Sequence, residues 1–169
     1  MGVVYRAQQL SLQRWVAIKI LTTTDKEAIT AARRMHREAE AMKALHHPNV
    51  VRLLDHGLDQ DPPFLVLEYI EESRSLLSLL VLDPPGPERA MSLAREVAGG
   101  LAHIHEHSLV HRDLKPANVL VDGDGHAKII DLGAVRDLAS NQTRLTQDGM
   151  VLGTLSYMAP EQLDGLPVT

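Results

Sequence analysis

Apolar and polar residues alternate along the start of the chain, which is the pattern of half-buried β-strands. Residues 3–8 and 15–21 are each expected to form a strand, and the polar residues between them favour a hairpin. In the second strand, Lys19 shares a face with Ala17 and Leu21. Such a lysine either extends to solvent from an edge strand or points into a cleft, and the pattern is consistent with both.

A helical period follows, with a helix expected over residues 25–45, Asp25 as its cap and Pro48 beyond its end. Its apolar stripe consists of Ala28, Ala31 or Ala32, Met35, Ala39, Met42 and Leu45. Glu38 borders this stripe. A carboxylate there loses hydration unless it is paired, and Lys19 is the natural partner. A Glu38 open to solvent at the edge of the helix fits the period equally well.

The pattern changes near residue 70. Strands are expected over residues 50–55 and 64–70, and helices over residues 76–82 and 88–107. The last of these helices is apolar on more than one stripe, so we expect it to be buried on several sides. We predict an α+β fold of two lobes, with the boundary at about residues 70–74.

One polar segment, residues 111–118 (His-Arg-Asp-Leu-Lys-Pro-Ala-Asn), lies between apolar anchors. Asp113 can accept a proton, Lys115 can neutralise anionic charge, and Asn118 can offer an oxygen to a hard cation. These groups suit phosphoryl transfer, although the segment alone is also consistent with a loop of solvated charges. Asp131 follows a predicted hairpin of strands 118–121 and 126–130, so it can meet the same cation as Asn118.

Two further patterns suggest sites that we do not favour. The Asp-Gly-Asp-Gly run at 122–125 starts like a calcium loop, but the ligands that should follow are absent, so a tight hairpin turn is expected. His103 and His107 share a helical face without an acidic His-Glu-x-x-His pattern, which favours a structural or solvated role. Residues 134–160 are expected to be largely irregular.

Composition narrows the class of protein. The 169 residues are 44% hydrophobic and 23% charged, which suits one globular domain or a fragment of a larger one. The formal charge of −5, with both signs interleaved, argues against nucleic-acid binding. No cysteine is present, which excludes disulfides. No signal peptide or membrane segment is recognised, so we expect a cytoplasmic domain whose parent protein could be anchored outside this segment.

Taken together, the motifs resemble a eukaryotic-type (Hanks-type) serine/threonine protein kinase domain of the bacterial kind, and they occur in that family's order over essentially the whole chain. The matching segments are Gly2-x-Val4 (Gly-rich loop), Val16-Ala17-Ile18-Lys19 (ATP lysine), Glu38 (helix αC glutamate), residues 111–118 (catalytic loop), Asp131-Leu132-Gly133 (metal triplet), and Gly153-Thr154 with Ala159-Pro160-Glu161 (end of the activation segment).

The resemblance implies transfer of the γ-phosphate of ATP, with Mg²⁺ or alternatively Mn²⁺, to Ser/Thr hydroxyls of protein substrates in signalling. It implies that Asp113 accepts the substrate proton, Lys115 contacts the γ-phosphate, and Asn118 and Asp131 hold the metal. The implied ATP-binding residues are Gly2, Val4, Ala17, Lys19, Glu38, the gatekeeper Leu67 and the hinge residues Glu68 to Ile70.

The resemblance also implies regulation. Arg112 beside Asp113 is similar to the arginine of kinases that are switched by activation-loop phosphorylation, because a guanidinium pairs well with a phosphate. Thr143 and Thr146 are the candidates for that phosphate, with autophosphorylation in trans as one route. Thr154 is expected to position Asp113 and Lys115.

The chain departs from the family pattern in three respects. The first two glycines of the Gly-rich loop and the first strand are missing, the triplet is Asp-Leu-Gly, and the helices after the activation segment are absent. We therefore expect a partial kinase domain over residues 1–169, with an N-lobe at 1–70 and an incomplete C-lobe at 71–169. The alternatives are a nucleotide-binding pseudokinase or interaction module without transfer, and a small-molecule kinase, which the activation segment disfavours.

Overall fold

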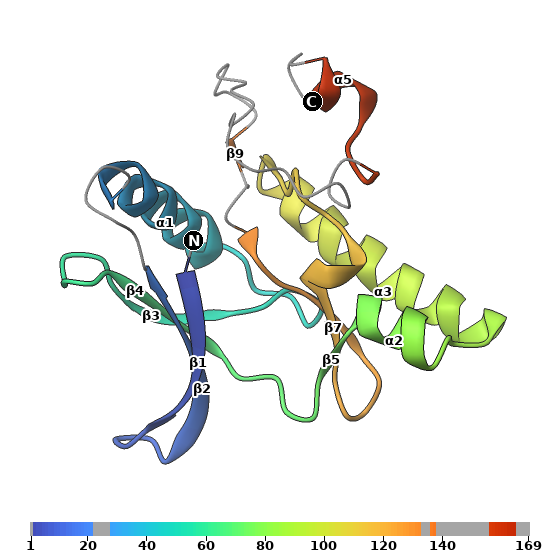
Figure 1. Ribbon diagram of the computed structural model, residues 1–169, viewed down its shortest axis with the longest axis horizontal. Coiled ribbons are helices and arrows are strands. Elements are labelled where there is room, and N and C mark those ends of the chain that lie inside the picture. Colours follow the sequence, from blue (N-terminus) through green and yellow to red (C-terminus); the bar gives the residue numbers. More distant parts are fainter. Residues whose placement is uncertain (1, 22–27, 133–135, 138–155, 165–169) are drawn as a thin grey trace.

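The computed structural model describes residues 2–21, 28–132, 136–137 and 156–164, which form two parts (Figure 1). An antiparallel sheet and one helix make up the N-terminal part, and two helices with short strands make up most of the C-terminal part. A single connecting segment after β4 leads from the first part to the second (Figure 1).

The N-terminal sheet has four strands in the order β1-β2-β4-β3. Their bounds are β1 Gly2–Gln9, β2 Arg14–Leu21, β3 Leu53–Gly57 and β4 Phe64–Glu68. The predicted hairpin of β1 and β2 is confirmed. Because β2 lies between β1 and β4, the interpretation of Lys19 as an edge-strand lysine is wrong.

The strand expected over residues 50–55 is displaced along the chain. Val51 donates its N–H to the Ile129 carbonyl at 2.8 Å, and Ile129 donates to the Asn49 carbonyl at 2.8 Å. These residues therefore pair with the C-terminal part, and β3 starts only at Leu53. The strand expected over 64–70 likewise ends earlier, at Glu68.

The helix described in the N-terminal part, α1 (Ala28–Lys43), packs one face on the sheet. Met35 and Ala39 are buried against Leu65 of β4, as the apolar stripe predicts. Asp25, the predicted cap, lies outside the described residues. Beyond the helix, Leu45 is buried in a second core that reaches Ile104 and Ile129. This core ties the helix end to the C-terminal part.

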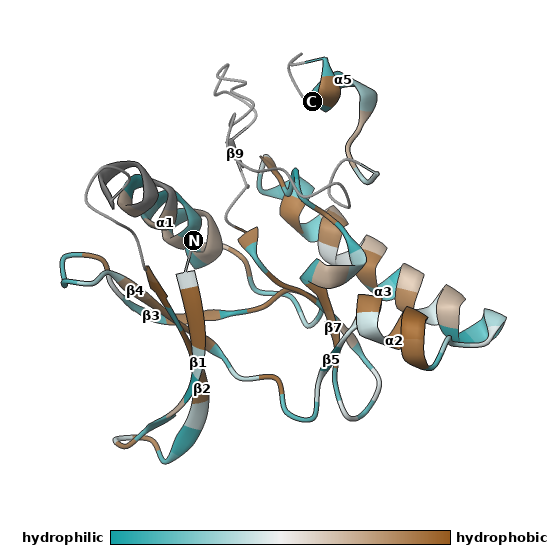
Figure 2. Cartoon of the chain, viewed as in Figure 1, coloured by the Kyte–Doolittle hydropathy of each residue, from teal (hydrophilic) through white to brown (hydrophobic). Residues whose placement is uncertain are grey.

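The C-terminal part contains a sheet of order β5-β7-β8 and a pair β6-β9. The elements are β5 Arg74–Ser75, α2 Leu76–Leu82, α3 Pro87–Glu106, β6 Leu109–Val110, the 3₁₀ turn η1 Pro116–Asn118, β7 Val119–Val121, β8 Ala127–Ile129, β9 Arg136–Asp137 and α5 Pro160–Leu163. Ser75 caps α2 by accepting the Ser78 N–H. Figure 2 shows α2 as a strongly hydrophobic helix.

Helix α3 differs from expectation. Only one stripe of it, Leu93, Gly100 and Ile104, is buried, whereas Met91 is 63% exposed. The expectation of burial on several sides is wrong for the described residues, because the strands and the loop around Val50 cover only one side. Gly100 is required at this contact, since a Cβ there would lie 2.9 Å from the Asn49 carbonyl oxygen.

The turn between β7 and β8 is a tight hairpin, as predicted. Asp122 donates its N–H to the His126 carbonyl and accepts the Gly125 N–H, and its side chain accepts the His126 N–H at 2.7 Å. Gly125 has a φ of 88°, which glycine adopts without strain. Among the described segments, no helix is long and apolar enough to cross a membrane.

Candidate active site

Lys19 and Glu38 form the first contact of the site. The Lys19 Nζ lies 2.7 Å and 3.0 Å from the two Glu38 carboxylate oxygens. Glu38 is only 5% exposed, and its burial raises the pKa of the carboxyl group against the opposing effect of Lys19. The predicted pairing is present, and the interpretation of Glu38 as a solvated edge residue is wrong.

The same ammonium also contacts Asp131. Its Nζ lies 2.9 Å from the Asp131 Oδ1, and the Asp131 side chain is 48% exposed. Burial by itself would lower the pKa of Lys19, but the charges of Glu38 and Asp131 outweigh it and raise this pKa above its ordinary value. Lys19 therefore stays cationic at neutral pH and joins a strand, a helix and the segment after β8.

His111 supports the loop that follows it. Its side chain is buried, with Nε2 3.3 Å from the Ile130 carbonyl oxygen, and Nδ1 accepts the Asp113 N–H at 3.3 Å. Burial lowers the pKa of His111, which favours the neutral ring that donates at one nitrogen and accepts at the other. The ring therefore holds the backbone of Asp113 against the segment that leads to Asp131.

Asp113 lies at the centre of a second polar cluster. Its carboxylate oxygens lie 3.1 Å and 2.9 Å from the Lys115 Nζ. The Asn118 amide donates to the Asp113 carbonyl at 2.8 Å and to Oδ2 at 3.0 Å. With its Nδ2 engaged in this way, Asn118 keeps its Oδ1 on the other side of the amide. The loop is a connected network rather than a set of solvated charges.

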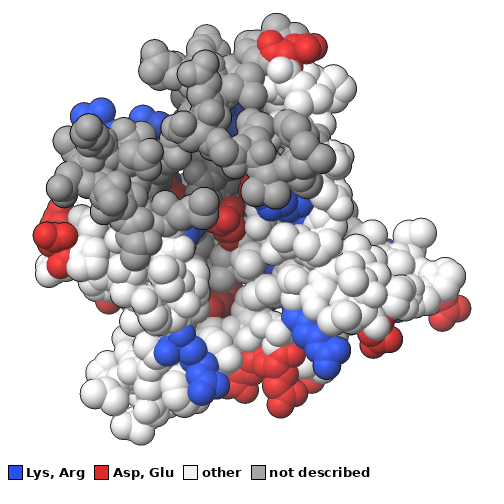
Figure 3. All heavy atoms as spheres, viewed as in Figure 1, with Lys and Arg blue, Asp and Glu red and all other residues white. Residues whose placement is uncertain are grey.

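The β-hairpin brings the two clusters together. Ile130 donates its N–H to the Asn118 carbonyl at 2.9 Å, so Asn118 lies opposite the residue that precedes Asp131. In the space-filling view, acidic and basic side chains meet in the hollow between the two parts (Figure 3). Asp131 and Arg112 both have positive φ, 62° and 63°, and strained residues of this kind concentrate at functional sites.

The sheet presents the predicted nucleotide residues on one face. Val4 is paired with Lys19, and Ala17 with Leu67; directly opposed residues share a face, as do alternate residues of one strand. Gly2 lies on this face too, and a Cβ there would be 2.7 Å from the Ile20 carbonyl oxygen. Glu68 ends β4, and Ile70 is buried beyond it.

Two contacting residues were missed by the sequence analysis. The Gln162 Nε2 donates to the Arg112 carbonyl at 2.8 Å, and the Lys128 Nζ lies 2.9 Å from the Glu68 Oε1. A signal existed for each: Gln162 directly follows the Ala-Pro-Glu motif, and Lys128 is a lysine inside an apolar strand, as Lys19 is. Thr143, Thr146 and Thr154 lie outside the described residues.

Three histidines form a separate cluster: His47 in the loop after α1, His103 in α3 and His107 directly after α3. The His103 ring stacks on His47 with centroids 5.3 Å apart and accepts the His46 N–H at 3.2 Å, while His107 bonds to the His103 carbonyl. Within the described part of the chain, no group of three or more histidine, cysteine or acidic residues has the arrangement of a metal site. These histidines pack the loop after α1 against α3.

Comparison with known proteins identifies the family of this chain. The protein-family profile described as "Protein kinase domain" matches residues 1–169. The chain belongs to the protein kinase family. The expected fold class, a kinase-like antiparallel sheet with helices, is thereby confirmed.

Similar curated proteins are bacterial kinases. This kinase domain is 38% identical over 168 residues to the serine/threonine-protein kinase PrkC of Bacillus subtilis, covering 98% of the chain and 25% of PrkC. It is 41% identical over 175 residues to the serine/threonine-protein kinase pkn2 of Myxococcus xanthus, covering 99% of the chain and 21% of pkn2. PknL of Mycobacterium tuberculosis is 38% identical over 163 residues, 95% of the chain and 40% of PknL. The chain thus spans between a fifth and two fifths of these relatives.

Proposed function

We propose that this domain transfers the γ-phosphate of ATP to serine or threonine hydroxyls of protein substrates. The observation that carries the proposal is the position of the Lys19 ammonium, 2.7 Å from Glu38 and 2.9 Å from Asp131, in a chain whose catalytic loop holds Asp113, Lys115 and Asn118 in one network. Phosphoryl transfer depends mainly on positioning and charge stabilisation, and these contacts supply both.

The nucleotide is proposed to lie under the sheet. Lys19 would contact the α- and β-phosphates, with Glu38 fixing its direction, and Gly2 and Val4 would cover them. Ala17 and Leu67 would border the adenine, which would bond to the backbone of the segment from Glu68 to Ile70. Lys19 exchanges one anionic partner, Asp131, for phosphate without losing its buried partner Glu38.

The residues present fit a hard divalent cation. Mg²⁺ is typically held by one or two carboxylates together with substrate phosphates, and the Asp131 carboxylate and Asn118 amide oxygen are donors of that type. The clusters also contain three carboxylates, Glu38, Asp113 and Asp131, against the two ammonium groups of Lys19 and Lys115. A bound Mg²⁺, with Mn²⁺ as its alternative, would supply positive charge for the phosphate oxygens.

Asp113 is proposed as the proton acceptor. The substrate hydroxyl oxygen forms a bond to the γ-phosphorus, and the bond from that phosphorus to the bridging oxygen breaks to release ADP. The hydroxyl proton passes to Asp113. Lys115 lies 2.9 Å from this carboxylate, within reach of a transferring phosphoryl group beside it. Asn118 orients the carboxylate through the Oδ2 contact of 3.0 Å.

Arg112 is the proposed receiver of an activation-segment phosphate on Thr143 or Thr146, formed by autophosphorylation in trans. Thr154 is proposed to position Asp113 and Lys115. Mass spectrometry after incubation with ATP tests the phosphorylation sites. Phosphate on neither Thr143 nor Thr146 in an active enzyme would contradict this assignment.

Incubation with radioactive ATP and a generic protein substrate tests the proposed function. Labelled phosphoserine or phosphothreonine is expected from the wild-type chain, and labelling by Asp113→Asn is expected to be at least about 10²-fold slower. ATP binding by the wild-type chain without any transfer would instead support the nucleotide-binding module, which no observation on the described residues favours at present. Transfer by Asp113→Asn at a rate close to that of the wild-type chain would contradict the assignment of the base.

A further inference from the structure

A carboxylate at the end of β4 joins three segments of the chain. The Glu68 Oε1 accepts from the Lys128 Nζ at 2.9 Å and from the Arg52 N–H at 2.8 Å. The Glu68 N–H in turn donates to the Arg52 carbonyl at 3.0 Å. Glu68 thus holds both backbone groups of Arg52 and the side chain of Lys128.

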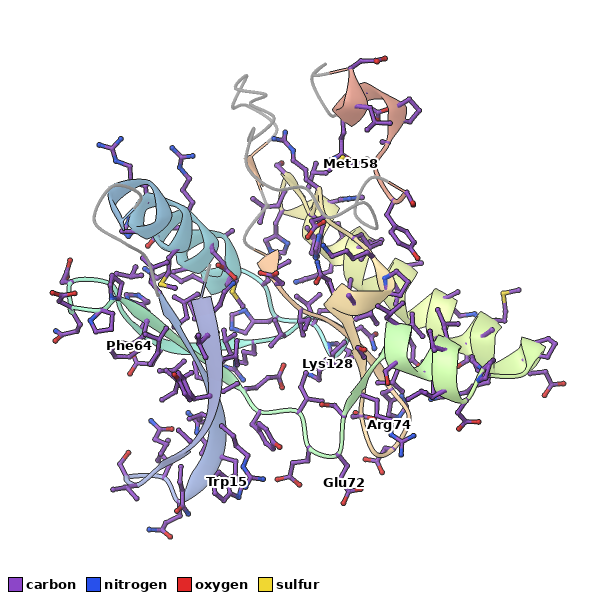
Figure 4. The ribbon with its side chains drawn as sticks, viewed as in Figure 1. Trp15, Phe64, Glu72, Arg74, Lys128 and Met158 are labelled. Atoms are coloured by element: carbon purple, nitrogen blue, oxygen red, sulfur yellow. The ribbon has the colours of Figure 1, made fainter. Side chains whose placement is uncertain are left out.

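Lys128 reaches this carboxylate from the C-terminal part. It is the middle residue of β8, where it pairs with Leu120, and in Figure 4 it lies between the segment that follows β4 and the strands of the C-terminal part. β8 leads directly toward Asp131. The ion pair therefore connects the start of the proposed adenine-binding segment to the strand that leads to Asp131, a proposed metal ligand.

The backbone around this pair is already joined to β8. Val51 and Asn49 exchange backbone hydrogen bonds with Ile129, both at 2.8 Å, and the Asn49 side chain donates to the Ala127 carbonyl at 2.8 Å. Residues 49–52 and β8 thus form one unit. Glu68 attaches the end of β4 to both members of that unit.

We propose that Glu68 and Lys128 form a positioning pair that sets the separation between the adenine-binding backbone and Asp131. This inference rests on the proposed nucleotide site. ATP contacts both ends of the site at once, so a fixed separation removes conformational freedom that binding would otherwise have to remove. Neither side chain touches the phosphates in this role: Glu68 acts through the Arg52 backbone that it holds, and Lys128 acts through the Glu68 carboxylate.

An ordinary surface ion pair would have little effect, because solvent and side-chain entropy offset its attraction. The Glu68–Lys128 pair differs in its burial, with side chains 27% and 19% exposed, and in its shared backbone donor. The chain offers a matched control in Lys43 and Glu40, which are 2.6 Å apart at the end of α1 with side chains 47% and 52% exposed.

Equilibrium binding of ATP and of adenosine, with Mg²⁺ present, tests the pair on the chain and its variants. Lys128→Met and Glu68→Gln are each expected to weaken ATP binding about fivefold. Adenosine has no phosphates and would contact only the adenine-binding end of the site, so the affinity for adenosine should change less. The affinity for ATP divided by the affinity for adenosine should therefore fall. The double variant should bind ATP no more weakly than either single variant, since all three variants lose the same Glu68–Lys128 ion pair.

The controls separate this role from general destabilisation. Lys128→Arg is expected to keep the ratio of affinities, and Lys43→Met should leave both affinities unchanged. If a thermal scan shows that Lys128→Met is unfolded, the binding test relies on Glu68→Gln, which is nearly isosteric with the original residue. Equal losses for ATP and adenosine, or no loss, in a folded Glu68→Gln would overturn the positioning pair alone. A wild-type chain that binds no ATP would overturn the proposed function and this inference with it.

Discussion

Lys19 and Asp131 are 112 positions apart in the sequence, and their Nζ and Oδ1 atoms are 2.9 Å apart in the structure. The same ammonium holds the buried Glu38. One cation therefore has two anionic partners, of which Asp131 is the more exposed. Since a more exposed partner is the easier to replace, incoming phosphate is expected to displace Asp131 and leave Glu38 in place.

Lys19→Met should reduce kcat/KM for ATP by about 10²-fold, the scale for loss of one preorganised donor to a developing anionic charge. The variant also leaves Glu38 buried without its ammonium, so a lower thermal midpoint is expected. Steady-state kinetics with protein substrate measures the first effect. Lys43→Met is the control, and a Lys19→Met enzyme as active as this control would contradict the assignment.

Asp113→Asn should lower kcat by about 10²- to 10⁴-fold, the usual contribution of a general base, while ATP binding persists. The substitution keeps the size of the side chain but removes the proton acceptor. A transfer assay and a nucleotide-binding titration on the same sample separate the two quantities. Asp124→Asn, in the exposed turn between β7 and β8, should retain full activity. A parallel loss of binding in Asp113→Asn would point to a structural effect instead.

Gln162→Glu should lower kcat about tenfold at neutral pH. The Gln162 amide donates to the Arg112 carbonyl at 2.8 Å, whereas a carboxylate at this position has no proton to donate and repels the carbonyl oxygen. Protonation of the new Glu restores a donor, so activity relative to wild type should recover as the pH falls toward the ordinary Glu range. Gln162→Met, which has no donor at any pH, should show no recovery. Measuring kcat of each variant relative to wild-type kcat as a function of pH tests the hydrogen bond. A relative kcat of Gln162→Glu that does not change with pH would exclude it.

The free energy of unfolding should decrease as the pH falls below 6.5, the ordinary pKa of histidine. Burial lowers the pKa of His111 in the folded chain, so below pH 6.5 the unfolded chain binds more protons at this residue. The contribution of the neutral His111 ring to the free energy of unfolding is therefore complete only above pH 6.5. Urea titrations at several pH values measure this slope.

His111→Gln should make the slope shallower without abolishing it, because burial also lowers the pKa of His103. The exposed His105→Gln is the control and should leave the slope unchanged. An unaltered slope in His111→Gln would show that this ring does not carry the effect.

Local patterns predicted most elements because the period of burial along a strand or helix is written in the sequence. Helix α2 (Leu76–Leu82) has the predicted bounds. The strand expected at residues 50–55 shows the limit of such patterns. Val50 and Val51 are β-branched, as strand residues often are. However, Val50 lies opposite Ile129 of the other part in an isolated parallel bridge, and Val51 donates its N–H to the Ile129 carbonyl. A local pattern indicates that a residue is buried without identifying the partner that buries it.

By itself the sequence determined which residue types suit phosphoryl transfer and that a buried Glu38 would require a cationic partner such as Lys19. Only the tertiary structure decided that Lys19 takes two partners, that Lys128 ties Glu68 to β8, and that Gln162 holds the Arg112 carbonyl. The physical reason is that side-chain contacts act over a few ångströms in space, at any separation in sequence. Motif spacing supplies the chemical groups, and packing of the two parts supplies their distances.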